Sequence, residues 1–173
     1  LVEFIAIDLS IKTSIISAAK QIKLEYDKLD VLIHNAADFD ITRKQPVITQ
    51  EGVESIWATN HIGPVFLTKQ LIDLLKRSEQ GRIITVASQG LVLYPKLEVD
   101  VDDPEFKTRD FSVQKAYYQS KLAQVMYTYW LAKELAATAI TVNCIRVTNV
   151  KLDLSRYPEI SGFMKFLFSI KSK

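Results

Sequence analysis

The sequence predicts an α/β domain built on a Rossmann-like, doubly wound parallel sheet with helices on both faces. Four short apolar runs with the character of buried strands alternate with three segments whose apolar residues recur at helical spacing. This alternation is typical of parallel sheets, because each parallel connection needs a crossover. With 173 residues, no internal repeat and no linker, residues 1–173 are predicted to form a single domain.

The predicted elements follow one another along the chain with short connections. The strands are expected at residues 2–7, 30–34, 81–87 and 140–147, and the helices at residues 11–27, 51–75 and 112–137. Ser10 is the expected N-cap of the first helix, and Gly63-Pro64 is expected to break or bend the second. Residues 97–109 read as a charged loop.

Composition excludes several classes of function. The 22 basic and 20 acidic residues leave a net charge of +2 and are interspersed, which gives no basis for binding nucleic acid. Cys144 is the single cysteine, and two histidines, His34 and His61, are too few for a histidine-rich metal centre. No apolar run approaches the roughly 18 residues that span a bilayer, and residues 1–8 do not resemble a signal peptide. We therefore expect a cytoplasmic protein.

Tyr117 and Lys121 form the sharpest chemical motif. Residues four apart on a helix share one face, so the phenol and the ammonium can lie in one site. A nearby cation lowers a tyrosine pKa from about 10 toward neutrality, and such a tyrosine can exchange a proton with a substrate oxygen. A Tyr and a Lys at this spacing also occur in helices that have no catalytic role.

Further polar residues follow the predicted strands. Ser88 ends the third strand, and Asn35-Ala36-Ala37 follows the second, so both lie at the carboxyl edge where open α/β sheets bind ligands. A serine can equally cap a turn there, and the asparagine can form an Asx turn. Asn60 lies within a helical segment, where asparagine is a mediocre helix former.

Taken in order, these residues resemble the short-chain dehydrogenases/reductases. The resemblance covers about residues 1–155 and is closer to the retinol-dehydrogenase-like branch. It rests on the strand followed by Asp8-Leu9-Ser10, on Asn35-Ala36-Ala37, on Asn60-His-Ile-Gly63, on Ser88 and on Tyr117-x-x-Ser-Lys121-Leu-Ala123, with an acidic insertion between the last two. The order and spacing of all five motifs agree with the family.

The resemblance implies an oxidoreductase that transfers hydride between NADP(H) or NAD(H), with NADP(H) preferred, and a small-molecule alcohol or carbonyl compound. Four residues carry over as catalytic: Tyr117 as general acid/base, Lys121 holding the nicotinamide ribose and lowering the Tyr117 pKa, Ser88 binding the substrate oxygen, and Asn60 positioning a water that links Lys121 to solvent. Asp8 and Leu9 would border the adenine, and Asn35, Ala36 and Ala37 would contact the adenosine side. The family also implies homo-oligomers formed through the long helices.

The pattern departs from the family in three places. The Gly-rich turn that approaches the pyrophosphate is absent from the chain, so we expect further residues, including two strands, before Leu1, and more after Lys173. Val147-Thr148 replace the usual Pro-Gly and Leu152 the following Thr, although the main-chain amide near Val150 could still bind the nicotinamide. Finally, Asn35-Ala36-Ala37 replaces Asn-Ala-Gly.

The aromatic, basic tail at residues 161–173 leaves three interpretations open. It can form an apolar lid over a hydrophobic substrate or an ordinary core-packing helix, while contact with a membrane surface is less favoured. Two functions also remain open. The departures above favour a non-catalytic binding or interaction module, whereas the intact set of Asn60, Ser88, Tyr117 and Lys121 favours the enzyme, which is our prediction.

Overall fold

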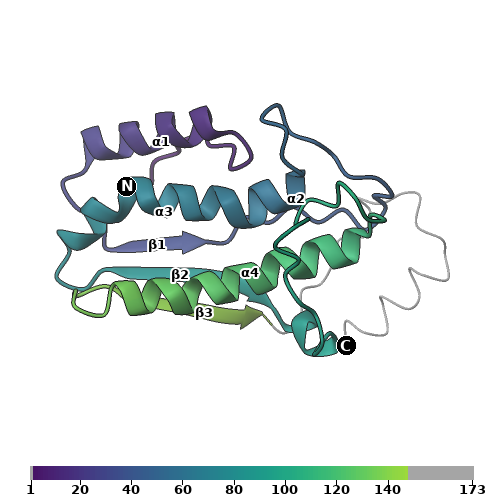
Figure 1. The fold of residues 1–173 in the computed structure, drawn as a ribbon. Helices are drawn as coiled ribbons and strands as arrows, with labels where there is room; N and C mark the ends of the chain where they lie inside the picture. Colours follow the sequence, from purple (N-terminus) through teal and green to yellow (C-terminus); the bar gives the residue numbers. More distant parts are fainter. Residues whose placement is uncertain (1, 148–173) are drawn as a thin grey trace.

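A computed structural model describes residues 2–147, and its centre is a parallel sheet of three strands (Figure 1). The strands are β1 (Val31–His34), β2 (Arg82–Ser88) and β3 (Thr141–Val147), in the order β1-β2-β3. Three of the four predicted strands are therefore found close to their expected positions. The predicted class, an α/β fold with a parallel sheet, is confirmed.

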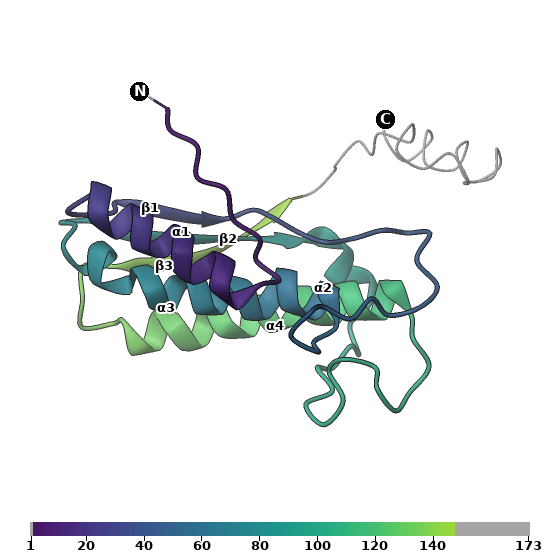
Figure 2. The same ribbon diagram turned by 90° about the horizontal axis from the view of Figure 1, so that it is seen from above.

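Helices connect the strands. They are α1 (Lys12–Glu25), α2 (Ser55–Trp57), the π-helical turn η1 (Ala58–Ile62), α3 (Gly63–Lys76), the 3-10 turn η2 (Gln89–Leu93) and α4 (Val113–Glu134). In the described part of the chain, α3 and α4 cover the same face of the sheet, and α1 packs against α3 (Figure 2). Cover on both faces was the prediction, but here one face has helices.

The core lies between this face of the sheet and the helices. Ile83 of β2 packs there with Leu75 of α3 and Leu131 of α4, all at least nine-tenths buried. On the opposite face Ile33 is 56% exposed and Ile145 is 48% exposed. The alternation along each strand thus separates a packed face from an open one.

The predicted strand at residues 2–7 is wrong. These residues form no strand, and Val2 and Phe4 are 99% and 90% exposed. A strand needs a ladder partner, and no strand among residues 2–147 pairs with this segment. Its apolar composition alone could not show this.

Ser10 is not the N-cap of α1. The cap position is Ile11, which makes no side-chain hydrogen bond to the helix, while the Ser10 hydroxyl donates to the Asp8 carboxylate, 2.7 Å away. The first N–H group of α1, that of Lys12, instead donates to a carboxylate oxygen of Glu51, 2.8 Å away and 39 residues further along the chain. A carboxylate at this end also complements the helix dipole.

Gly63-Pro64 does not interrupt the predicted second helix. Instead α2, η1 and α3 follow one another directly, and Pro64 occupies the first turn of α3, where its lack of an N–H group is tolerated. A wider π turn precedes the proline, because the N–H of Gly63 bonds to the carbonyl of Ala58, five residues back. The proline therefore marks a π turn in a continuous helical path.

The charged loop at residues 97–109 is fastened to α4. Arg109 donates to the Asp103 carbonyl and to the Gln119 side chain, both at 2.8 Å, and its guanidinium lies 3.9 Å from the centre of the Phe106 ring. Gln119, only 2% exposed, also donates to the Pro104 carbonyl. Within residues 2–147, no helix is both long and apolar enough to cross a membrane.

Candidate active site

The candidate site lies where β2 ends beside the first half of α4. Ser88 is the last residue of β2, and its hydroxyl accepts a hydrogen bond from the N–H of Gly90, 3.1 Å away, at the start of η2. Tyr117 and Lys121 lie one turn apart on α4, which packs against β2. The fold therefore brings these three predicted residues to one place.

Aromatic packing fixes the ring of Tyr117. It lies 4.3 Å, centre to centre, from the tilted ring of Phe39 and 5.2 Å from the Tyr118 ring in an edge-on arrangement, and it adjoins the buried cluster that includes Ile56 and Phe106. Burial raises the pKa of the phenol, a hydrogen bond with the Ser88 side chain opposes this, and Tyr118 raises it further. The Ser88 side chain therefore lies next to the Tyr117 phenol.

Lys121 is buried, with only 2% of its surface exposed. Its Nζ donates to the carbonyl of Val86 in β2 at 2.9 Å and lies 5.7 Å from the centre of the Tyr117 ring. Burial lowers the pKa of Lys121 to about 8, against a smaller opposing effect of Cys144. The predicted lowering of the Tyr117 pKa by Lys121 is not found, because burial dominates the pKa of the phenol.

Asn60 is fully buried in η1, where the helical path meets α4. Its Oδ1 accepts from the N–H of Asp38 at 2.6 Å, and its Nδ2 donates to the Asp38 carbonyl and to the Ser120 hydroxyl, each at 3.0 Å. Ser120 in turn donates to the carbonyl of Tyr117 at 2.7 Å. Asn60 is therefore linked to α4 through Ser120. Its role in positioning a water stays a prediction.

The sequence alone did not single out Asp38, Ser120 or Gln124, which complete this arrangement. Ser120 lay within the motif around Tyr117, but nothing in the spacing showed that its hydroxyl meets Asn60. Gln124 follows Lys121 by three residues, which places both on neighbouring faces of α4. That helical spacing was the one available signal.

The residues predicted to contact a dinucleotide lie at the margin of the same region. Asp8, Asn35, Ala36 and Ala37 are exposed, and Leu9 is partly buried. Asn35 directly follows β1, so the three residues beginning there lie at the carboxyl edge of the sheet, next to the end of β2. Val150 lies outside the described residues, as do Thr148, Leu152 and the tail at 161–173.

The side chains of Ser88, Tyr117 and Lys121 fit the nicotinamide end of a nicotinamide dinucleotide. A cation, a phenol and a serine hydroxyl converge beside the open edge of a parallel sheet, which is where such cofactors bind in doubly wound folds. The small, exposed side chains of Ala36 and Ala37 leave the main chain accessible to a ligand. The chain holds no Gly-rich turn for the pyrophosphate.

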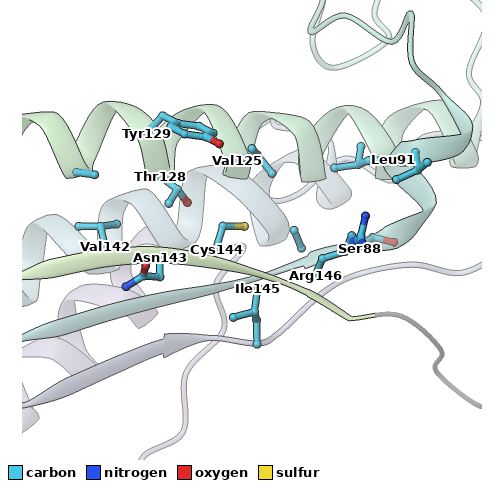
Figure 3. A pocket seen from close by; sticks show the side chains of 13 residues that line it. Ser88, Leu91, Val125, Thr128, Tyr129, Val142, Asn143, Cys144, Ile145 and Arg146 are labelled. Carbon is cyan, nitrogen blue, oxygen red and sulfur yellow. The ribbon is translucent and has the colours of Figure 1, made fainter.

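A cavity of about 430 Å³ runs between α4 and β3 and reaches Ser88 (Figure 3). Its lining is mostly apolar and includes Leu91, Val125 and Val142, together with Thr128 of α4 and Cys144 of β3. Burial raises the pKa of the Cys144 thiol, and a hydrogen bond with Thr128 opposes this. Ser88 is shared by this cavity and the site at Tyr117.

Comparison with known proteins agrees with this geometry. The family model described as short chain dehydrogenase matches residues 1–97. Human retinol dehydrogenase 13 is 35% identical over 156 residues, which are 90% of this chain and 45% of that protein, and human polyprenol dehydrogenase is 33% identical over 162 residues, 90% and 47%. The chain thus spans about half the length of these curated relatives.

Solved structures share the fold. That of an uncharacterized protein from Mycobacterium Paratuberculosis superposes with a TM-score of 0.69 at 29% sequence identity, covering 81% of this chain and 48% of that one. The chain belongs to the short-chain dehydrogenase family. Among the named relatives, retinol dehydrogenases recur, as the resemblance to that branch predicted.

Proposed function

We propose that the complete protein carrying this chain is an NAD(P)-dependent oxidoreductase that interconverts an alcohol and a carbonyl compound. The observation that carries the proposal is that the side chains of Tyr117 and Ser88 interact at the end of β2, with the Lys121 ammonium 5.7 Å from the centre of the Tyr117 ring. Two neighbouring hydroxyls can both bind one substrate oxygen. Membership of the family supports the same activity.

The reaction needs a hydride at the substrate carbon and a proton at its oxygen. The nicotinamide supplies or accepts the hydride when it is bound. Tyr117 donates the proton to the carbonyl oxygen in reduction and accepts it from the alcohol in oxidation. Ser88 donates a hydrogen bond to the same oxygen and stabilises the charge that develops there.

Lys121 and the segment that begins at Asn35 are proposed to hold two different parts of the cofactor. Lys121, whose pKa of about 8 leaves it protonated at pH 7, can donate to ribose hydroxyls. Asn35 and the main chain of Ala36 and Ala37 would face the adenosine part. NADP(H) remains our preferred coenzyme over NAD(H).

The proposed substrate is a hydrophobic alcohol or the corresponding aldehyde or ketone. The mostly apolar cavity that reaches Ser88 supports this, as do relatives named for dehydrogenation of retinol and polyprenol. An apolar wall binds such a molecule by removing its surface from water. The two hydroxyls at Tyr117 and Ser88 then select the oxygen-bearing end.

The test is turnover by the complete protein with NADPH or NADH and a series of aldehydes of increasing chain length, followed by the loss of nicotinamide absorbance. We expect kcat/KM to rise with chain length for one coenzyme. Binding of coenzyme without turnover of any aldehyde or alcohol in the series would support the non-catalytic binding module instead.

A further inference from the structure

Gln124 is a buried polar residue of α4 with no part in the proposed proton transfer. It is only 3% exposed, and its Nε2 donates to the main-chain carbonyl of Asn60 in η1. The Thr128 hydroxyl donates to the Gln124 carbonyl at 2.9 Å, while the side-chain Oε1 of Gln124 has no partner among the described residues. Burying the unpaired Oε1 of this amide costs free energy. We therefore look to the hydrogen bond that its Nε2 donates for the contribution of Gln124.

The Asn60 carbonyl needs this donor because of Pro64. In an α-helix the carbonyl of Asn60 would accept from the N–H four residues later, which proline lacks. Proline at residue 64 therefore removes one donor that this carbonyl would have in a regular α-helix. The side chain of Gln124 satisfies it across the interface between η1 and α4.

The same turn carries the side chain that reaches the catalytic helix. Asn60 bonds to both main-chain groups of Asp38 and to Ser120, and Ser120 bonds to the carbonyl of Tyr117. Gln124 and Ser120 therefore hold η1 at two points, one on each side of Lys121 along α4. Movement of the turn would shift Tyr117 and Lys121 relative to β2.

We propose that Gln124 is a positioning residue for the catalytic set, acting through the Asn60 carbonyl and the π turn. The proposal rests on the proposed function for its catalytic consequence only. Its structural part, that Gln124 holds Asn60 on Asp38, stands on contacts within residues 2–147. A donor at residue 124 is the required feature, and the rest of the side chain fills space.

The test uses Gln124→Met in the complete protein, since methionine keeps the length and shape and removes the donor. We expect kcat to fall about 10-fold to 100-fold while KM for the coenzyme changes less than about threefold, because sub-ångström displacement of positioned groups costs this much. Hydrogen exchange at the Asp38 amide, which donates to Asn60, should accelerate about tenfold or more.

Two control variants separate positioning from stability. Gln114→Met, an exposed position on the same helix, controls for the substitution itself. Leu135→Ala, in the core at the far end of α4, controls for lost stability.

Two results would overturn the proposal. One is a kcat for Gln124→Met within about twofold of wild type, with unchanged exchange at Asp38. The other is a loss of kcat that Leu135→Ala reproduces at equal stability. If the wild-type protein turns over no substrate, the proposed function fails, while exchange at Asp38 still decides whether Gln124 holds the turn.

Discussion

Gly63 touches the main chain of Leu9 so closely that a Cβ at residue 63 would lie 2.1 Å from the Leu9 carbonyl oxygen. No real Cβ approaches an oxygen to that distance, so the first residue of α3 must be glycine for the segment before α1 to lie where it does. This contact fixes Leu9, one of the residues that the family resemblance places beside the adenine.

Gly63→Ala should therefore destabilise the protein, although alanine is the better helix former by about 1 kcal/mol. The overlap is with main-chain atoms, which cannot rotate away, and overpacking of this kind costs about 1–3 kcal/mol. Chemical denaturation should show a lower free energy of unfolding, and coenzyme affinity should weaken as Leu9 moves. Lys69→Ala, at an exposed position on α3, should change neither.

The N-terminus of α1 offers a test of a corrected prediction. Glu51→Ala should lower the free energy of unfolding by about 0.5–1 kcal/mol, because it removes the acceptor of the Lys12 N–H and a charge that complements the helix dipole. Ser10→Ala should have the smaller effect, since Ser10 bonds to Asp8 and not to the helix. The reverse order in paired denaturation curves would restore Ser10 as the cap.

Two histidines, His34 buried and His61 half-buried, make stability depend on pH. Burial lowers the pKa of both His34 and His61 to about 4, whereas the unfolded chain titrates near 6.5. Between these values the unfolded state binds more protons, so the free energy of unfolding falls as pH drops from 6.5 to 4, by about 1.4 kcal/mol per pH unit for each histidine.

This slope can be separated from that of the carboxylates by substitution. His61→Phe keeps a ring beside Trp57, and His34→Gln keeps a donor for the Thr68 hydroxyl, which lies 2.7 Å from His34 Nε2. Each variant should flatten the slope between pH 6.5 and 4. Parallel curves for wild type and both variants would show that neither histidine is buried in its neutral form.

Lys121 is predicted to cost stability while it serves function. Because burial lowers its pKa from 10.5 to about 8, the folded state disfavours the ammonium at pH 7. Lys121→Met should therefore raise the free energy of unfolding at pH 7 by about 1–3 kcal/mol, less the lost hydrogen bond to Val86. Turnover should disappear, a trade between stability and activity that is common at active sites. A destabilised Lys121→Met would contradict this.

The sequence predicted the positions of the helices and strands better than their pairing and burial. Periodicity placed β2, β3 and α4 to within a few residues, and the helical spacing put Tyr117 and Lys121 on one face. It could not show that residues 2–7 lack a strand partner, because an apolar segment forms a strand only where a neighbouring strand pairs with it. The sequence also could not show how deeply Tyr117 is buried. This burial raises the pKa of the phenol, whereas a lower pKa was expected.

Contacts across long sequence separations were the other limit. Glu51 caps a helix 39 residues away, and Gln124 donates to a carbonyl 64 residues away. Neither partner carries a local signal, because the bonds form only when separate elements meet. Pro64 predicts a break in the helix, whereas in the structure it follows a π turn in which the Asn60 carbonyl accepts from Gln124.

Tyr117 is proposed to exchange a proton with the substrate oxygen while hydride passes between the nicotinamide and the substrate carbon. The direct measurement is transfer of deuterium from C4-deuterated NADPH or NADH to an aldehyde by the complete protein, compared with Tyr117→Phe and with Tyr118→Phe as control. We predict deuterium at the alcohol carbon for wild type and Tyr118→Phe. For Tyr117→Phe the rate should be lower by about 10²-fold to 10⁴-fold with coenzyme affinity retained. Transfer by Tyr117→Phe at the wild-type rate would contradict the account.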